Sequence, residues 1–247
     1  MNVPKVNIFG VPISKLGFRD TLTQLIAAVE SRKPHQVITA NPIMVMTAME
    51  DPAYMRMMKS AEIVVPDGAG VVWAAGYVGN PVTERVPGIE VMSELFRTAE
   101  ERGWKVYLLG ASPEVIAEAV GNIRQKHPRL ILAGFRDGYF GPEADAEVIA
   151  EIRRVEPELL FVGRSAATQD PWINQHKEAL GVPVMMGVGG SFDIFAGKLK
   201  RAPKLFRQLK LEWFYRLIQE PYRYKRMLVL PKFALKVIRE KENVQKA

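Results

Sequence analysis

The first 197 residues alternate between short apolar runs and amphipathic stretches. Runs rich in Val, Ile and Leu predict β-strands at residues 5–9, 36–40, 62–65, 105–109, 130–134, 158–162 and 183–188. The stretches between them repeat apolar residues at helical spacing, as Ile89, Met92, Leu95, Phe96 and Ala99 do. Strands that alternate with helices in this way predict an α/β fold with a largely parallel sheet.

Two of the predicted helices have clear end signals. Gly103 is placed to end the helix that contains Ile89, because glycine readily takes the left-handed conformation at a helix C-terminus. Ser112 is placed to cap the next helix, Pro113 suits its first turn, and Glu114 suits the positive end of its dipole. These signals predict one helix before the strand at 105–109 and another helix after it in the sequence.

The pattern changes after about residue 197. The chain becomes helical, basic and aromatic, and Pro203, Pro221 and Pro231 divide it into about three predicted helices. Residues 198–247 contain fifteen Lys and Arg and four Asp and Glu, a net charge of +11, whereas residues 1–197 carry nineteen and twenty-three, or −4. We therefore predict a catalytic core over residues 1–197 and a basic helical appendage over residues 198–247.

Aromatic side chains lie among the positive charges of this appendage. That combination is typical of an amphipathic surface that contacts anionic lipid. RNA binding is the competing interpretation, but no RNA-module motif accompanies the charge. We therefore predict an anionic membrane surface, and no nucleic acid, as a partner.

Composition excludes several classes of site. Cysteine is absent, which excludes disulfides, thiolate metal sites and cysteine nucleophiles, and His35, His127 and His176 lie far apart without metal-binding spacing. The longest uncharged stretch, residues 68–83, has sixteen residues and falls short of the roughly 20 that span a bilayer. The N-terminus has no long apolar run before a cleavage site, which favours a cytoplasmic protein.

The residues at the ends of the predicted strands are the first candidates for a site, because open α/β sheets bind ligands at the carboxyl ends of their strands. Asp67 follows the strand at 62–65 in a glycine-flanked loop, where it can remove a proton from a substrate hydroxyl. Asp-Gly is also a common turn. Asn41, which follows Thr39 at the preceding strand, suits either a ligand contact or a helix cap.

Two glycine-rich loops also follow strands, one at Gly110 and the other containing Gly187, Gly189 and Gly190. Such loops can offer backbone N–H groups to a phosphate, but glycine serves close helix–sheet packing equally well. Neither loop matches the ATPase phosphate loop or the dinucleotide fingerprint, so ATPase and nicotinamide-enzyme functions lose their usual support.

The stretch 163–167 superficially resembles the nucleophile elbow of serine hydrolases, with Ser165 as the nucleophile. The only histidine downstream is His176, on the very next helix and badly placed to reach back, so acyl transfer is not favoured. Gln169 suits either a sugar or nucleotide contact or a cap.

The appendage, or tail, contains Arg216, Arg223 and Arg226, for which there are two interpretations. A guanidinium fork is well shaped for a diphosphate, and the alternative is a solvated face.

Six short motifs occur in order: Thr39-Ala40-Asn41, Val65-Pro66-Asp67-Gly68-Ala69-Gly70, Glu84-Arg85-Val86-Pro87-Gly88, Gly187-Val188-Gly189-Gly190-Ser191-Phe192-Asp193, Lys200-Arg201-Ala202-Pro203 and Leu211-Glu212-Trp213-Phe214-Tyr215-Arg216-Leu217. Together they closely resemble the WecG/TagA/CpsF glycosyltransferase family, nearly end to end. One such motif is weak, but the ordered set is specific.

The resemblance implies a Rossmann-like core with a C-terminal appendage. It implies transfer of N-acetylmannosamine, with inversion, from its UDP donor to the 4-hydroxyl of GlcNAc-diphospho-undecaprenol, as in synthesis of the wall teichoic acid linkage unit. An acceptor that stays in the membrane also accounts for the basic tail, and places the enzyme as a peripheral protein on the inner face of the cell membrane.

The motifs also assign roles to residues by resemblance. Asp67 aligns with the proposed catalytic base, and Thr39, Asn41 and Arg85 with pocket residues around it. Gln169 aligns with a glutamine of the family. The appendage arginines thought to complete the active site are matched by Arg216, Arg223 and Arg226.

No Asp-x-Asp metal motif occurs in the chain. We therefore expect a metal-independent enzyme without a cofactor, in which arginines stabilise the departing UDP, and we include a homo-oligomer among the expected partners.

One stretch departs from the family. Where the family usually has Gly-Ala-Pro-Lys-Gln-Glu-x-Trp-Ile, residues 165–173 read Ser-Ala-Ala-Thr-Gln-Asp-Pro-Trp-Ile, so a basic residue is missing and a proline has moved. Two alternatives stay open. One is transfer of another UDP-sugar to a lipid-linked acceptor for capsule or exopolysaccharide, and the other is a non-catalytic lipid-surface or RNA-binding protein.

Overall fold

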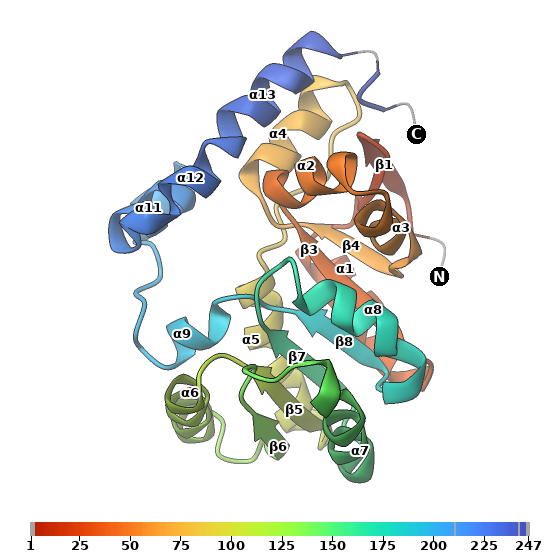
Figure 1. Cartoon of the computed structure of the whole chain (residues 1–247), viewed down its shortest axis with the longest axis vertical. Helices are drawn as coiled ribbons and strands as arrows, with labels where there is room; N and C mark the ends of the chain where they lie inside the picture. The colour runs from red at the N-terminus through yellow and green to blue at the C-terminus, as the bar shows by residue number, and fades with distance from the viewer. Residues whose placement is uncertain (1–2, 210, 242, 246–247) are drawn as a thin grey trace.

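A six-stranded parallel sheet forms the centre of the protein (Figure 1). The computed structural model describes residues 3–209, 211–241 and 243–245. Its strand order is β4-β3-β8-β7-β5-β6, with β3 (His35–Ala40), β4 (Ile63–Pro66), β5 (Lys105–Gly110), β6 (Ile131–Arg136), β7 (Leu159–Gly163) and β8 (Val184–Gly187). Each neighbouring pair runs parallel, so the predicted α/β, Rossmann-like fold with a largely parallel sheet is confirmed.

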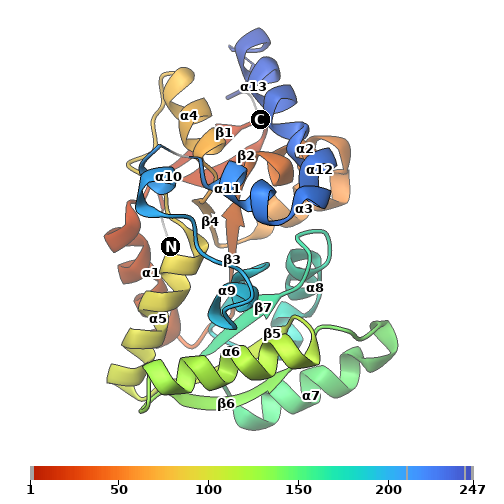
Figure 2. The same ribbon diagram turned by 90° about the vertical axis from the view of Figure 1, so that its left-hand side faces the viewer.

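Helices cover both faces of the sheet. One face carries α1 (Phe18–Glu30), α5 (Gly88–Arg102) and α6 (Pro113–Lys126), and the other carries α2 (Pro42–Glu50), α3 (Pro52–Ser60), α7 (Asp145–Val155) and α8 (Gln169–Leu180). Figure 2 shows α1 and α5 on one side of the strands and α3 and α8 on the other. Strands covered on both faces read as continuous apolar runs, which is why every residue of β7 is buried.

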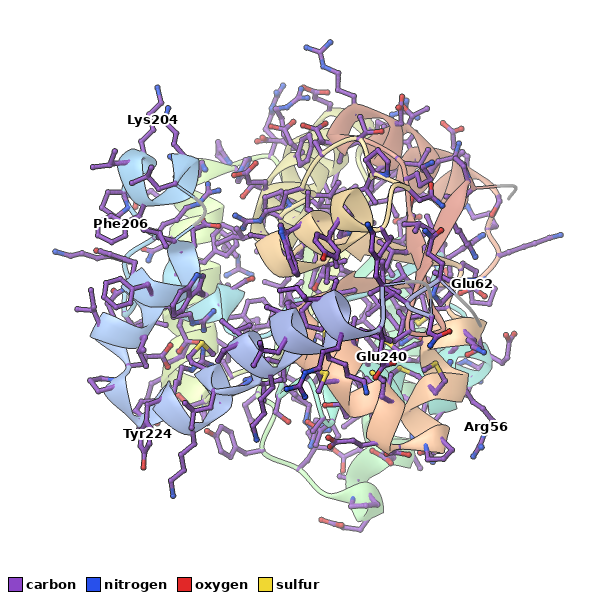
Figure 3. All side chains as sticks on the ribbon, turned by 90° about the horizontal axis from the view of Figure 1, so that it is seen from above. Arg56, Glu62, Lys204, Phe206, Tyr224 and Glu240 are labelled. Atoms are coloured by element: carbon purple, nitrogen blue, oxygen red, sulfur yellow. The ribbon has the colours of Figure 1, made fainter. Side chains whose placement is uncertain are left out.

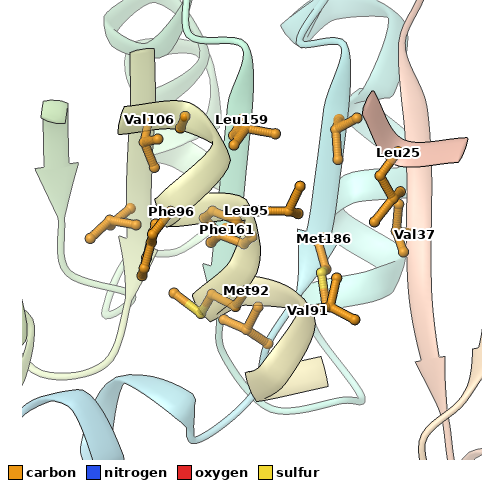
Figure 4. Packing of buried hydrophobic residues seen from close by; sticks show 14 of the residues in the cluster. Leu25, Val37, Val91, Met92, Leu95, Phe96, Val106, Leu159, Phe161 and Met186 are labelled. Atoms are coloured by element: carbon orange, nitrogen blue, oxygen red, sulfur yellow. The ribbon is translucent and has the colours of Figure 1, made fainter. Parts of the chain in front are cut away.

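The apolar stripe of α5 packs directly on the sheet (Figure 4). Phe96 meets Phe161 of β7 edge to face, with ring centroids 5.3 Å apart. The end signals predicted for α5 and α6 are confirmed. Gly103 has φ of 69° at the end of α5, and Ser112 Oγ accepts a hydrogen bond from the Val115 N–H at the start of α6.

The predicted strand at 5–9 exists but lies outside the main sheet. β1 (Lys5–Ile8) pairs antiparallel with β2 (Val11–Ser14), and these two strands form a sheet of their own. The turn between them is Phe9–Gly10, with φ of 51° and 81°. Positive φ at both central residues is the turn that suits the twist of a two-residue hairpin. The sequence patterns did not predict β2, which contains Pro12.

The described part of the tail is divided more finely than predicted. It forms α10 (Lys204–Gln208), α11 (Glu212–Gln219), a 3₁₀ turn at Pro221–Arg223, α12 (Tyr224–Met227) and α13 (Val229–Arg239). The expectation that Pro231 separates two helices is wrong, because Pro231 lies in the first turn of α13. Proline is tolerated there, since the first N–H groups of a helix have no partner within the helix.

The last helix belongs to the hydrophobic core. Phe233 and Val237 of α13 are buried against α2 and α4 (Ala69–Tyr77), and the Phe9 N–H donates to the Val244 carbonyl at 2.7 Å. Figure 1 shows α13 lying along α4 and α2, while α11 and α12 lie to the left of the sheet. The predicted boundary at residue 197 thus ends the sheet region, but the end of the chain packs back onto it.

Candidate active site

A cleft of about 1060 Å³ lies between the carboxyl ends of the strands and the tail helices. Its floor comes from the loops that follow β3, β4, β7 and β8, and its other wall comes from α11, α12 and α13. This is the edge at which open α/β sheets bind ligands. The predicted residues that line it are Thr39, Asn41, Asp67, Gln169, Gly189, Gly190, Arg216, Arg223 and Arg226.

Asp67 follows β4 directly, and its main chain is fixed to the neighbouring strand. Its N–H donates to the Ala40 carbonyl at 3.0 Å, and so does the Gly68 N–H. A Cβ at Gly68 would lie 2.7 Å from the Pro42 ring, so only glycine allows the two loops to approach this closely. The loop therefore holds the Asp67 carboxylate in one place at the floor of the cleft.

The surroundings of Asp67 favour a stronger base than an ordinary carboxylate. Burial raises its pKa, Arg85 opposes that rise, and Glu212 adds to it. The side chain keeps 31% of its surface exposed, so a substrate can still reach it. A carboxylate with a raised pKa removes a hydroxyl proton more effectively once it is ionised.

Arg85 lies behind Asp67, in a second cavity of about 210 Å³ that shares Thr39 and Asp67 with the cleft. Its Nε donates to the Asp67 carbonyl at 2.5 Å, and its Nη2 lies 3.5 Å from the Asp67 carboxylate. Arg85 Nη1 forms an ion pair with Glu212 of α11. Arg85 therefore holds the Asp67 loop rather than lining the main cleft.

Asn41 caps a helix and also faces the cleft. Its Oδ1 accepts hydrogen bonds from the N–H groups of Ile43 at 3.0 Å and Met44 at 3.2 Å, which caps α2, and the residue also lines the cleft. Thr39 Oγ1 lies 3.4 Å from the Gly187 carbonyl of β8 and joins the ends of two neighbouring strands.

Gln169 fixes the glycine loop that follows β8. Its Oε1 accepts from the Gly189 N–H at 2.9 Å, and its Nε2 donates to Asp170 Oδ2 at 3.2 Å. Asp170 is fully buried, and burial raises its pKa to about 7. Gly190 leaves room for Arg216, because a Cβ there would lie 2.3 Å from the Arg216 Nη2.

Two predicted glycines serve packing instead. Gly110 has φ of 139°, and a Cβ there would lie 2.3 Å from the Gly163 carbonyl oxygen. At Gly187 a Cβ would lie 2.4 Å from the Asp170 Oδ1. Among the described residues, neither glycine lines the cleft or the second cavity.

Two of the three tail arginines pair with the same carboxylate. Arg216 Nε lies 2.9 Å and Arg223 Nε 3.3 Å from Glu220 Oε2. Arg226 makes no ion pair with an acidic side chain of the described residues. Burial is the largest cause that lowers its pKa, and the positive charges of Arg223 and Arg216 lower it further. Asp193 lines the same cleft and interacts electrostatically with Arg216 and Arg223. Three guanidinium groups and the two carboxylates of Glu220 and Asp193 still leave a net positive site suited to a diphosphate.

Comparison with known proteins decides the family. Residues 6–247 match the sequence model of the glycosyl transferase WecG/TagA/CpsF family. The chain belongs to this family. The resemblance drawn from the six motifs is therefore confirmed, and the protein is a glycosyltransferase.

Curated relatives match this glycosyltransferase over almost their whole length. A Bacillus subtilis strain 168 protein is 35% identical over 98% of this chain and 91% of its own. A Staphylococcus aureus strain MW2 protein is 36% identical over 100% and 97%, and a Bacillus spizizenii protein is 34% identical over 92% and 90%. All three are named N-acetylglucosaminyldiphosphoundecaprenol N-acetyl-beta-D-mannosaminyltransferase.

Ser165 and His176 do not form the nucleophile–base pair of a serine hydrolase in this glycosyltransferase. Ser165 Oγ lies 2.9 Å from Thr168 Oγ1, whereas His176 Nε2 lies 3.2 Å from Asp145 Oδ2. Trp172 Nε1 donates to the other oxygen of Asp145 at 2.7 Å, so this tryptophan fastens α8 to α7.

Sequence reasoning missed several charged residues of the site. Glu212 pairs with Arg85, Asp193 and Arg164 line the cleft, and Asp170 supports Gln169. Glu212 and Asp193 stand inside the motifs that carried the family resemblance, and that position was the available signal.

Two further observations concern the described residues as a group. No helix among them is long and apolar enough to cross a membrane. They also contain no cluster of three or more histidine and acidic side chains that could hold a metal ion.

Proposed function

We propose that this glycosyltransferase transfers N-acetylmannosamine from a UDP donor to the 4-hydroxyl of GlcNAc-diphospho-undecaprenol, in synthesis of the wall teichoic acid linkage unit. The names of its relatives support the reaction, since the matches cover at least 90% of each of the three proteins. One observation carries the chemistry. The Asp67 carboxylate opens into a cleft whose opposite wall holds three arginines.

The proposed reaction is a single displacement with inversion. Asp67 takes the proton of the acceptor hydroxyl, and the hydroxyl oxygen attacks the anomeric carbon of the donor sugar. The bond from that carbon to the phosphate oxygen breaks, and its electron pair leaves with UDP. Negative charge develops on the departing diphosphate, where fixed positive groups lower the barrier most.

We assign the role of stabilising this charge to Arg216, Arg223 and Arg226, without a metal ion or cofactor. All three line the cleft that Asp67 also lines, and their positive charges outnumber the negative charges of Glu220 and Asp193 beside them. The enzyme is expected to keep its turnover in excess EDTA. Loss of turnover there, restored by magnesium or manganese, would contradict metal independence.

We propose that the tail also brings the enzyme to the anionic inner face of the cell membrane, as a peripheral protein. Large apolar side chains of the tail are exposed, among them Leu205, Leu209, Phe214, Ile218, Tyr222, Tyr224 and Leu228. Figure 3 shows Lys204 and Tyr224 at the outer edge of the tail helices. Apolar groups beside basic ones suit an anionic lipid surface, where each Lys or Arg contributes about 1 kcal/mol.

A turnover assay across a panel of UDP-sugars tests the proposal. Purified enzyme, a short-chain GlcNAc-diphospho-lipid and each donor are mixed, and the product is identified by mass spectrometry. UDP-N-acetylmannosamine is expected to be the preferred donor. Preference for another UDP-sugar would favour the capsule or exopolysaccharide reaction, and no transfer from any donor would favour a non-catalytic protein.

The expected homo-oligomer stays a prediction. Light scattering on the purified protein would check it.

A further inference from the structure

An ion-pair chain links the tail to Asp67. Glu212 is the first residue of α11, and its carboxylate pairs with Arg85 Nη1. The same guanidinium donates from Nε to the Asp67 carbonyl at 2.5 Å and places Nη2 3.5 Å from Asp67 Oδ1. One guanidinium therefore lies between two carboxylates, one on the sheet and one on the tail.

The two carboxylates do not share Arg85 equally. The contact with Glu212 is the closer of the two ion pairs, and the contact with the Asp67 carboxylate, at 3.5 Å, is the longer. The Arg85 and Glu212 side chains are only 26% and 22% exposed, so water and salt screen their interaction less than they screen a surface pair. Glu212 therefore competes with Asp67 for the guanidinium group of Arg85.

We propose that Glu212 is a positioning residue that keeps Arg85 from pairing fully with Asp67, so that Asp67 has its full strength as a base only while α11 is docked. This inference rests on the proposed function, because it assigns a condition to the same base. It gives the tail a role besides the arginine cluster and the membrane contact.

The electrostatics of the site agree with this role. Burial raises the pKa of Asp67 most, Arg85 lowers it, and Glu212 raises it. If the charge of Glu212 is removed, Asp67 is the only carboxylate of the two that pairs with Arg85, and the Asp67 pKa falls. The ionised form then persists to lower pH, but it is a weaker base.

Several other charged groups near the two cavities pair with acids other than Asp67 and Glu212. Arg201 and Arg207 pair with Glu90 of α5, and Arg216 and Arg223 pair with Glu220. The remaining charged side chains that line the two cavities are Lys200, Asp193, Arg164 and Arg226. None of these groups changes in a variant of Glu212, so a comparison at that one position isolates its effect on Asp67.

The test is the pH dependence of kcat in full-length Glu212→Gln, measured with a soluble short-chain acceptor. The rise of kcat with pH reports ionisation of the base. In the variant this rise should move to a pH about one unit lower, and the plateau should fall by about three- to tenfold. The KM for the UDP donor should stay within about twofold, because the arginine cluster is intact.

Two further variants separate charge from structure. Glu212→Asp keeps the charge and should restore most of the wild-type pH profile. Glu240→Gln removes a tail carboxylate that pairs with Lys236, and it should leave the profile unchanged. If the Gln and Asp variants of Glu212 changed the profile equally, the role of this residue would be packing and the proposal would be wrong.

Titration of the Asp67 carboxyl by carbon-13 NMR gives a readout that needs no turnover. The Asp67 resonance, assigned with Asp67→Asn, should titrate at lower pH in Glu212→Gln than in wild type. If the wild-type enzyme were inactive, the proposed function would be wrong, but this titration would still test whether Glu212 changes the pKa of Asp67. Active wild type with an unchanged titration in the variant would overturn the link and leave the proposed function standing.

Discussion

The two walls of the active site are held in place by different kinds of contact. The wall that carries Asp67 is an extension of the buried sheet, fixed by main-chain hydrogen bonds and by a glycine packed against Pro42. The wall that carries the arginines consists of α11, the 3₁₀ turn and α12, and none of these elements has a buried residue. Ion pairs act there instead: Arg216–Glu220 lies within this wall, and Arg85–Glu212 joins the wall to the rest of the protein.

This difference separates two tasks. The proposed base, Asp67, has to keep one position, and main-chain hydrogen bonds provide that. A few partly exposed ion pairs, each contributing on the order of 1 kcal/mol, fix a wall less firmly than a buried core does, so the arginine wall is the part of the site whose position is most easily changed. It is also the part that the proposed membrane contact would meet. The comparison therefore predicts that chemistry fails when either wall is damaged, but that stability falls only when the damage reaches the sheet side or the buried residues of α13.

The largest expected effect is at Asp67. Asp67→Asn removes the proton acceptor and should lower kcat by about 100- to 10,000-fold while binding of UDP persists. The control is Asp20→Asn, an exposed carboxylate on α1, which should behave as wild type. Turnover of the Asp67 variant near the wild-type rate would show that another group is the base.

The next effect concerns stability and divides the tail in two. Phe233 of α13 is 1% exposed, and Phe233→Ala should lower the free energy of unfolding by about 3 to 5 kcal/mol. Phe214→Ala on α11, where the ring is 42% exposed, should cost about 1 kcal/mol or less. Denaturant unfolding checks both. Equal losses would mean that α11 packs as firmly as α13.

A smaller effect on turnover is expected from the arginine wall. Arg226→Ala removes a guanidinium without leaving an acidic partner unpaired, and turnover of the soluble acceptor should fall by about 10- to 100-fold. Thermal unfolding should be unchanged, because α12 contains no buried residue. An unchanged kcat/KM would place the diphosphate elsewhere in the cleft.

The fold and part of the site could be predicted because they depend on local signals. The six strands of the sheet lie within two residues of their predicted ends, and Asp67 was found from its place after a strand. Ser112 and Gly103 act through neighbouring backbone, so their roles were readable as well. The resemblance to the family supplied the proposed placement of the tail arginines at the active site, which no local pattern gives.

The rest depends on contacts between distant parts of the chain. Nothing near Glu212 in the sequence indicates that it meets Arg85, since that pair forms only when α11 lies over the sheet. Gly110 lies between a strand and a helix, as a phosphate-binding glycine would, and only its contact with Gly163 shows that it serves packing. The hairpin of β1 and β2 was missed because its second strand contains a proline.

The smallest effect concerns the tail surface and sharpens the comparison most. Ile218 of α11 is 57% exposed, and Ile218→Ser should weaken binding to vesicles of anionic lipid by about fivefold, because one half-buried apolar side chain contributes about 1 kcal/mol at such a surface. Turnover of the soluble acceptor should be unchanged, since this substrate needs no membrane. Ile131→Ser on β6, where the side chain is 44% exposed but far from the tail in sequence, is the matched control and should bind vesicles as wild type does. Raising the salt above physiological strength, where screening already acts over about 8 Å, should weaken binding of both variants. Equal loss of vesicle binding from both substitutions would mean that the tail is not the membrane-facing part. The position of the arginine wall would then depend on its ion pairs and not on contact with the membrane.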